Sequence, residues 1–554
     1  MTRRNFCAYG VGATSVMRGL ELMANPFQQS PGAASGSSSS GEKWMADLAL
    51  INGKVMTLDA SQPEAEAVLV RRGRIVHVGK SDDVKAQARG AKVFDAGGRT
   101  VVPGFIDAHC HMEVTSAALQ YCADVHTPPL KSIADIQNAL KVWGAKIPKD
   151  QWIVGRGDFN FENDIVEKRL PNRLELDAVS QDRPVMVFAG RHITMANTTA
   201  LKTMGVWDPQ SKLPRGTLVH RDSSGIPTGI CTEVFYYMPD YSIDQMKVAV
   251  QAIAPNMFTA KGTTTIYTIP FSKNDIRADL ALQRSGDLPL RIRMYYHVPH
   301  MTSFEGLMDI GFLSGVGDDM FRFGGMKLFV DGAGSDGLGH RFADLKWTTE
   351  ELNNMVAGAD ANGMQVIMHC VTAEGRKMAI AAVEETRRRN PKRPYIIHRI
   401  EHGGDDGTME GIRHLRDMGV RISITPGRVR AGRNGPRYRT LVKEGFDPIL
   451  ITDTTGTTPG ASDILFKIAC VATSAEESGG APEGETLTFQ DALRMFTLSN
   501  ARVGYEDQYK GSISAGKLGD FAVLSGNPRG MAGAKLFDLK VQATILGGEV
   551  VSGA

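Results

Sequence analysis

Several features that mark large classes of protein are missing from this sequence of 554 residues. It has no run of about 18 uninterrupted apolar residues, so we expect no membrane-spanning helix. Its 63 Lys and Arg residues balance 61 Asp and Glu residues, and the net charge of +2 indicates no nucleic-acid partner. No glycine-rich phosphate-binding loop links a strand to a helix, and no Gly-x-Ser-x-Gly elbow has the required context. These absences argue against a nucleotide-dependent enzyme and against a serine hydrolase.

Cysteine is also scarce and scattered. The chain has six cysteines, and they form neither a Cys-x-x-Cys pair nor a compact framework. That spacing argues against a zinc ribbon and against a disulfide scaffold. We therefore expect free thiols at all six positions, which are Cys7, Cys110, Cys122, Cys231, Cys370 and Cys470.

The first 43 residues leave the location of the protein open. The segment TRRNF at residues 2–6 resembles a twin-arginine export signal and precedes a mildly apolar stretch at 7–17. Arg18 then interrupts the apolar stretch, and no clear Ala-x-Ala cleavage site follows. A Ser- and Gly-rich linker occupies residues 35–41. Periplasmic export and a cytoplasmic location are both retained as hypotheses, and residues 1–43 are left out of the fold prediction.

Both ends of the remaining chain are rich in short strands. Residues 44–100 contain several strand-like runs, with Asn52-Gly53 expected as the turn of a β-hairpin. Residues 509–554 show the same pattern. Neither piece has enough strands to bury a face alone. We therefore predict that residues 44–100 and 509–554 pair into one small β-sandwich domain.

The middle of the chain, residues 101–508, alternates strand-like runs with helical patterns, which is typical of a parallel sheet covered by helices. Eight runs fit the closed (β/α)₈ TIM barrel, an α/β fold. They are 101–106, 264–269, 290–298, 325–330, 365–368, 395–400, 420–425 and 449–452. An insertion at about 112–262 is far longer than an ordinary loop. We expect it to build a subdomain over the mouth of the barrel.

Candidate metal ligands fall at the ends of these runs. The first run leads into His109 and His111, which as alternate residues of a strand can point the same way. The carboxyl ends of barrel strands carry the active sites of barrel enzymes, and imidazoles with carboxylates suit divalent ions such as zinc. Four further residues lie on or just after later runs: Lys327, His369, His402 and Asp453. This distribution predicts a metal centre with one or two ions.

The same residues resemble a known family. PGFIDAHCH at 103–111, the lysine on a strand, the two further histidines and the last-strand aspartate are similar to the amidohydrolase superfamily pattern. Segments 152–157, 227–229, 327–332 and 398–402 resemble its third family, which includes N-substituted formamide deformylases. The resemblance extends from about residue 47 to 551.

The resemblance implies roles for the ligands. His109 and His111 would bind the more buried ion, and His369 and His402 the second, with Zn²⁺ as the expected metal. Lys327 would bridge the ions if its amine is carboxylated, because a carbamate can ligate and an ammonium cannot. Two alternatives stay open: Lys327 as a buried lysine paired with Asp331 or Asp336, and Glu233 as the bridging carboxylate.

Further residues are expected to act on the substrate. Asp453 would take a proton from the attacking water and return it to the leaving nitrogen. His192 would stabilise an oxyanion or hold the substrate. Arg191 is a candidate for binding a substrate carboxylate and Glu233 for binding substrate. Glu113 departs from the family pattern and can intrude on the site.

The predicted activity is hydrolysis of an amide, carbamate or cyclic imide bond in a small organic molecule. Two other hypotheses are retained. One is a metal-assisted lyase, such as a decarboxylase or a retro-aldol enzyme, on the same scaffold. The other is a silent binding protein, which the complete ligand set disfavours. Homo-oligomers are common among such enzymes, although no surface pattern in the sequence indicates one.

Overall fold

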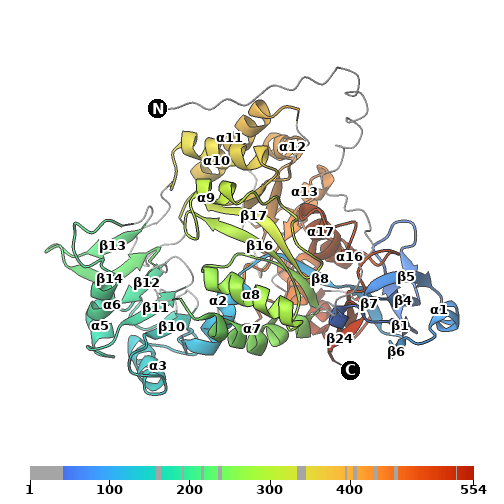
Figure 1. Ribbon diagram of the computed structural model, residues 1–554, viewed down its shortest axis with the longest axis horizontal. Coiled ribbons are helices and arrows are strands. Elements are labelled where there is room, and N and C mark those ends of the chain that lie inside the picture. Colours follow the sequence, from blue (N-terminus) through green and yellow to red (C-terminus); the bar gives the residue numbers. More distant parts are fainter. Residues whose placement is uncertain are drawn as a thin grey trace, which may run out of the picture. The chain divides into compact units, whose positions relative to one another are not determined.

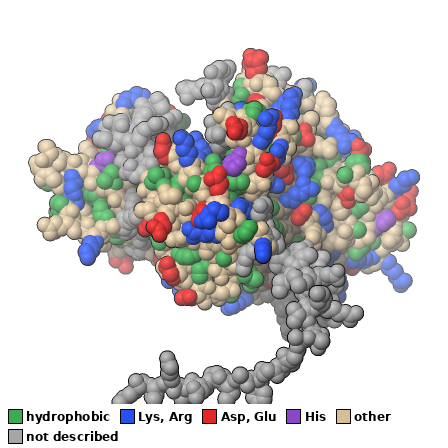
Figure 2. Space-filling model, turned by 90° about the horizontal axis from the view of Figure 1, so that it is seen from above, with side chains coloured by type: hydrophobic (Ala, Val, Ile, Leu, Met, Phe, Trp, Pro, Cys, Tyr) green, Lys and Arg blue, Asp and Glu red, His purple; other side chains and the backbone are tan. Residues whose placement is uncertain are grey.

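The computed structural model describes residues 42–553 except for 158–163, 190–192, 214–216, 235–236, 238–239, 333–344, 393–395, 403–407, 428–434, 455–459, 479 and 532. The described residues belong to one compact unit, Ser39–Ala554. Among them, no helix has the length and apolar character needed to cross a membrane. The five cysteines that are described are buried and free. On the face drawn in Figure 2, Lys and Arg side chains are interspersed with Asp and Glu.

The central sheet is an eight-stranded parallel barrel, as the sequence predicts. Its strands lie in chain order, each beside the next: β8 (Phe105–Cys110), β15 (Thr263–Thr268), β16 (Arg291–Val298), β17 (Phe321–Phe329), β18 (Gln365–His369), β19 (Arg399–Glu401), β20 (Arg421–Ile424) and β21 (Ile449–Leu450). The first and last strands meet through backbone hydrogen bonds: the Asp453 N–H donates to the His109 carbonyl, and the His111 N–H donates to the Thr454 carbonyl, both at 2.9 Å.

The first predicted run is wrong in one respect, because it joins parts of two strands. β7 (Thr100–Pro103) pairs with β22 (Phe521–Leu524) in the outer sheet, and only β8 belongs to the barrel. Gly104 lies between them, and its N–H donates to the Asp520 carbonyl at 2.9 Å. A Cβ at Gly104 would collide with the Thr264 side chain. Glycine therefore allows the chain to pass from one sheet to the other.

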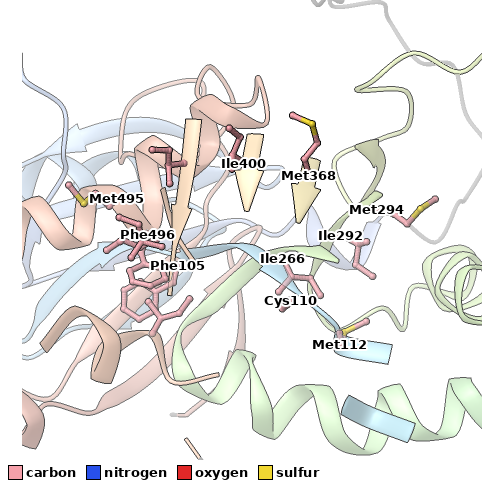
Figure 3. Packing of buried hydrophobic residues seen from close by; sticks show 14 of the residues in the cluster. Phe105, Cys110, Met112, Ile266, Ile292, Met294, Met368, Ile400, Met495 and Phe496 are labelled. Carbon is pink, nitrogen blue, oxygen red and sulfur yellow. The ribbon is translucent and has the colours of Figure 1, made fainter. Parts of the chain in front are cut away.

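Helices cover the outside of the barrel, with α7 and α8 along one side of the strands and α10 and α11 along another (Figure 1). Ile266, Ile292, Met368 and Ile400 come from separate strands and are buried in the large apolar core (Figure 3). The helices associated with the barrel are α7 (Ile243–Met257), α8 (Lys273–Ser285), α9 (Phe304–Asp309), α10 (Thr349–Ala361), α11 (Ala373–Arg389), α12 (Met409–Asp417), α13 (Tyr438–Lys443), α14 (Ile464–Ala472), α15 (Ala475–Ser478), α16 (Phe489–Arg494) and α17 (Asn500–Val503).

The insertion after β8 builds a sheet of its own, in the order β13-β14-β12-β11-β10-β9. Its elements are α2 (Met112–Tyr121), β9 (Ala123–Asp124), α3 (Ile133–Gly144), β10 (Ile153–Gly157), α5 (Arg173–Asp177), β11 (Val185–Ala189), β12 (Ile193–Ala196), α6 (Thr198–Thr203), β13 (Leu218–Arg221) and β14 (Pro227–Thr232). Buried Asn197 accepts a hydrogen bond from the Ala200 N–H and donates to the Ser180 and Arg183 carbonyls. The Asn197 side chain therefore stabilises the backbone of the insertion.

Strands from the two chain ends share a sheet, in the order β24-β23-β22-β7-β2-β3. A second sheet, β5-β4-β1-β6, forms the other layer. The predicted Asn52-Gly53 hairpin is wrong, because β1 and β2 belong to different sheets, and the hairpin lies between β4 and β5 instead. The bounds are β1 (Leu48–Ile51), β2 (Lys54–Met56), β3 (Glu64–Ala65), β4 (Ala67–Arg71), β5 (Arg74–Gly79), α1 (Ser81–Gln87), β6 (Lys92–Asp95), β23 (Val541–Leu546) and β24 (Glu549–Ser552).

Candidate metal centre

Three of the predicted residues form the core of the site. His109, His402 and Asp453 each offer a ligand atom, and these atoms lie within 4.8 Å of one another. The Asp453 Oδ1 atom is 3.7 Å from His109 Nε2, and Oδ2 is 3.7 Å from His402 Nδ1. Such distances are too long for hydrogen bonds. They suit donors around one ion with bonds of about 2.0–2.2 Å, because two such bonds place their donors up to about 4 Å apart.

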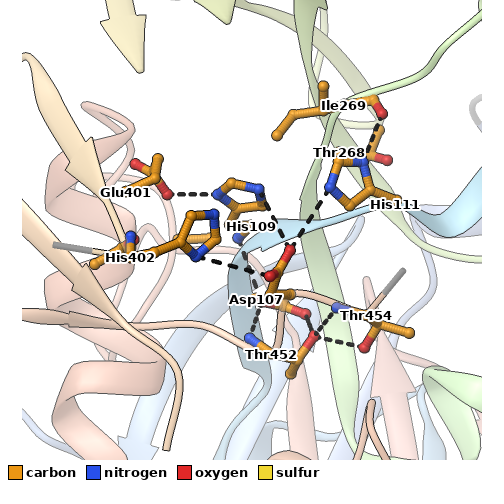
Figure 4. Close-up of polar contacts among 12 residues, drawn as sticks. Asp107, His109, His111, Thr268, Ile269, Glu401, His402, Thr452 and Thr454 are labelled. Atoms are coloured by element: carbon orange, nitrogen blue, oxygen red, sulfur yellow. Dashed lines mark hydrogen bonds and ion pairs between the residues drawn. The ribbon is translucent and has the colours of Figure 1, made fainter. Parts of the chain in front are cut away.

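His111 faces the same carboxylate. Its Nε2 atom lies 3.7 Å from Asp453 Oδ1, and its Nδ1 atom is 2.9 Å from the Ile269 carbonyl. Donation from Nδ1 to that carbonyl leaves the Nε2 lone pair directed at the centre. Figure 4 shows the rings of His109, His111 and His402 turned toward one point.

Lys327 and His369 lie on neighbouring strands beside this group. The His369 ring centroid is 4.8 Å from that of His402, and His369 ends β18. Lys327 is buried in β17, and no described residue forms a hydrogen bond with its Nζ atom. Burial lowers the pKa of Lys327 to about 8. A buried amine without a partner is costly, so this position needs a compensating group.

The predicted pairing of Lys327 with Asp331 is not present. Asp331 instead accepts hydrogen bonds from the backbone N–H groups of Val371 and Thr372 and from the Thr372 hydroxyl at the start of α11. The other proposed partner, Asp336, lies outside the described residues.

A buried carboxylate orients His109. Glu401 accepts a 2.5 Å hydrogen bond from His109 Nδ1 and two further bonds from the Arg399 guanidinium, at 2.7 and 2.8 Å. Burial raises the pKa of Glu401, but Arg399 and His109 outweigh this effect and hold it well below the usual range. The Glu401 carboxylate is thus ionised and fixes His109 with Nε2 directed at the centre.

Neutralising this carboxylate should weaken metal binding. We expect Glu401→Gln to raise the dissociation constant of the metal by about 10–100-fold, the usual effect of losing such a partner. Competition with a chelator, followed by elemental analysis, measures the change. Glu384→Gln is the matched control, because Glu384 holds the half-exposed His414 on the surface. Equal metal affinities for Glu401→Gln and the wild type would contradict the role given to Glu401.

Left-handed backbone occurs at the site. His402 has a φ of 57° and Asp453 a φ of 51°, values that residues other than glycine rarely adopt. The Asp453 turn is supported by buried Asp107, which accepts hydrogen bonds from the Thr452 N–H and hydroxyl. Strain of this kind persists where surrounding contacts hold it, and it concentrates at functional sites.

The other predicted site residues are Glu233, His192 and Arg191. Glu233 is buried with a φ of 54°, and its Oε1 atom lies 2.9 Å from the Nζ atom of Lys346. The Nζ atoms of Lys346 and Lys327 lie 5.6 and 5.0 Å from the centre of the same Phe329 ring, so the Glu233 pair is near the proposed ligands. The bridging and substrate-binding roles of Glu233 stay predictions. His192 and Arg191 lie outside the described residues.

Sequence reasoning missed the residues that support the ligands. Glu401 and Arg399 stand within the segment HRIEH at 398–402, where they alternate on β19. An acid and a base two residues apart on a buried strand could have indicated a charged pair pointing inward. The Asp107 contact joins residues 345 positions apart, and no local pattern indicates it.

A cavity of about 380 Å³ borders the centre. Phe271 lines it, and the Phe271 ring centroid is 5.3 Å from that of His111. Glu113 also lines it from α2 and accepts a 2.6 Å hydrogen bond from the Thr268 hydroxyl. Burial raises the pKa of Glu113 to about 7. Glu113 thus lies in the wall of a cavity beside the ligands, and its intrusion on the site stays a prediction.

Comparison with known proteins gives concordant matches. The family model described as "Amidohydrolase family" matches residues 92–552. N-substituted formamide deformylase of Arthrobacter pascens is 29% identical over 542 residues, which cover 91% of this chain and 98% of that protein. An uncharacterized metal-dependent hydrolase from Pyrococcus horikoshii OT3 has a similar fold, with a TM-score of 0.67 and 21% identity over 88% of this chain and 99% of its own. Atrazine chlorohydrolase TrzN from Arthrobacter aurescens TC1, solved with zinc, has a TM-score of 0.51 and 14% identity over 91% of this chain and 95% of its own.

Proposed function

The chain belongs to the amidohydrolase family, and from that premise we propose that it hydrolyses an amide, carbamate or cyclic imide bond of a small organic molecule. The observation that carries the proposal is the convergence of His109, His111 and His402 on Asp453 at the carboxyl ends of the barrel strands. Each histidine has a ring nitrogen 3.7 Å from an Asp453 oxygen, a distance that suits coordination rather than hydrogen bonding.

The donor set fits a divalent metal. Four imidazoles and a carboxylate match the ligand preferences of zinc, and the buried His109 Nε2 atom has no hydrogen-bond partner among the described residues. We propose that His109 and His111 hold one ion and that His369 and His402 hold a second. When bound, a zinc ion would lower the pKa of water to about 7 and polarise the scissile carbonyl.

We propose that Lys327 is carboxylated at Nζ and supplies the bridging ligand. The lowered pKa favours the neutral amine that reacts with carbon dioxide, forming an N–C bond and releasing a proton. The carbamate would carry a negative charge into a pocket lined by histidines. This accounts for a buried amine that no described residue binds.

We propose that Asp453 moves the proton. Its side chain is 30% exposed, while the His109 side chain is fully buried, so Asp453 lies where the centre meets the mouth of the barrel. In hydrolysis its carboxylate accepts a proton as water attacks the carbonyl carbon. It then donates that proton to the nitrogen as the C–N bond breaks.

Isotope incorporation tests the proposed reaction. The metal-loaded protein is incubated in ¹⁸O-labelled water with a panel of formamides, N-acyl compounds, carbamates and cyclic imides, and the products are analysed by mass spectrometry. Hydrolysis of a formamide or N-acyl compound places labelled oxygen in the acid product and releases an amine, whereas a cyclic imide opens to a labelled acid that keeps its nitrogen as an amide. Product without the label would indicate lyase chemistry, and no turnover of any member by fully loaded protein would contradict the proposal.

A further inference from the structure

The cavity beside the centre is built jointly by the barrel and the insertion. Phe271 and His300 line it from the barrel side, whereas Arg156 and Phe188 line it from β10 and β11 of the insertion sheet. Contact between Phe271 and His111 places one wall against a proposed metal ligand. The proposed substrate would have its carbonyl at the centre and the rest of its structure in this cavity. The inference below rests on the proposed function.

Arg156 has an unusual environment within this cavity. It is half-buried, and its guanidinium carbon lies 4.2 Å from the centre of the Phe188 ring on the adjacent strand. Stacking on an aromatic ring fixes the plane of a guanidinium while leaving its N–H donors available. Among the described residues, no carboxylate forms an ion pair with its guanidinium, whose one side-chain contact of hydrogen-bond type is with Cys122.

The other described arginines of the insertion are all engaged. Arg169 binds Glu175 through two hydrogen bonds, and Arg173 binds Asp177 and Thr198. Arg183 donates to the carbonyls of three residues, and Arg221 likewise donates to three. Arg156 thus differs from these neighbours, because it lines a cavity and its guanidinium has no carboxylate or carbonyl partner among the described residues.

The acidic residues of the cavity have other partners or lie at its edge. Asp275 accepts 3.0 Å hydrogen bonds from the backbone N–H groups of Phe271 and Ser272 at the start of α8. Glu113 is bound by Thr268 and lies against the Asp279 carboxyl group. Asp240 is exposed. None of these carboxylates neutralises the Arg156 guanidinium.

We infer that Arg156 binds a carboxylate of the substrate. A planar guanidinium with free donors matches a carboxylate through two parallel hydrogen bonds. Phe188, Tyr241 and Phe271 supply apolar walls for the part of the molecule between the carboxylate and the scissile bond. The substrate class is therefore an N-formyl, N-acyl or N-carbamoyl compound that carries a free carboxylate, as N-acyl amino acids do.

Matched ligand pairs test this assignment. N-formylglycine, N-acetylglycine and N-benzoylglycine are each compared with the corresponding neutral glycinamide. Binding to the metal-loaded protein is measured by calorimetry, and KM and kcat are measured wherever turnover occurs. We expect at least one acid to bind about 10–100-fold more tightly than its amide, the usual size of a charge-assisted pair of hydrogen bonds. In Arg156→Met this preference should disappear through a higher KM, with kcat for the amide and the metal content unchanged. Arg156→Lys should restore part of it.

Arg169→Met is the control, because Arg169 lies in the same insertion but is paired with Glu175. Equal binding of acid and amide in all three pairs would overturn the inference, as would a preference that survives in Arg156→Met. Because binding is measured separately from turnover, a carboxylate preference without ¹⁸O-labelled hydrolysis would uphold Arg156 and reject the proposed reaction. Labelled hydrolysis without a preference for the acid over the amide would uphold the proposed reaction and reject the role of Arg156.

Discussion

Asp453→Asn is expected to lower kcat by about 10²–10⁴-fold while the protein keeps its fold and its metal. Asparagine preserves the shape of the side chain and one oxygen donor, but an amide cannot accept and return a proton at neutral pH. The effect should therefore fall on kcat rather than on KM. Steady-state kinetics on a substrate from the panel, with elemental analysis of the same sample, measures both quantities.

Asp417→Asn is the control for Asp453→Asn, because Asp417 is 65% exposed at the end of α12. It should retain wild-type kcat. If Asp453→Asn also retained wild-type kcat with the metal bound, Asp453 would not carry the proton.

Replacing Lys327 should lower activity by a similar factor, but through loss of metal rather than loss of proton transfer. Lys327→Met keeps most of the side-chain volume in β17 but cannot form a carbamate, so we expect loss of at least one metal ion and of nearly all activity. Lys327→Ala should show the same loss, but it leaves space in which formate can stand in for the carbamate oxygens. Added formate should therefore restore metal and part of the activity to Lys327→Ala and not to Lys327→Met.

The carbamate also has a direct signature. Wild-type protein should have a mass 44 Da above that of the unmodified chain under native conditions, because carbon dioxide adds to the amine. Full metal content and activity in Lys327→Met would contradict the bridging role. That result would mean that the other ligands bind the metal and support activity without Lys327.

The sequence predicts the barrel well because strand order in a TIM barrel follows chain order. That His109, His111, His369 and His402 lie close together could be predicted because their positions at strand ends decide where their side chains go. What the sequence could not predict depends on contacts between distant segments. The hydrogen bond of His109 with Glu401, and the support of Thr452 by Asp107, join segments far apart in the chain that no local pattern connects.

Turn residues predicted the connections between strands less well than the apolar runs predicted the strands. Asn52-Gly53 is a strong hairpin signal, yet here it carries the chain from one sheet to another, and Arg72-Gly73 makes the hairpin. Continuous apolar character concealed the change of sheet at Gly104, because strands of both sheets are buried there. Twin-arginine export remains a prediction, since residues 1–41 lie outside the described part of the chain.

Metal content tests the central claim most directly. Protein purified without a histidine tag is reconstituted with Zn²⁺ and bicarbonate, freed of excess metal and analysed by elemental mass spectrometry beside His109→Ala and the surface variant His414→Ala. We predict stoichiometric zinc in the wild type and in His414→Ala, with loss of at least one ion in His109→Ala, whose buried imidazole is removed from the centre. A wild-type protein that binds no metal after reconstitution would contradict the account.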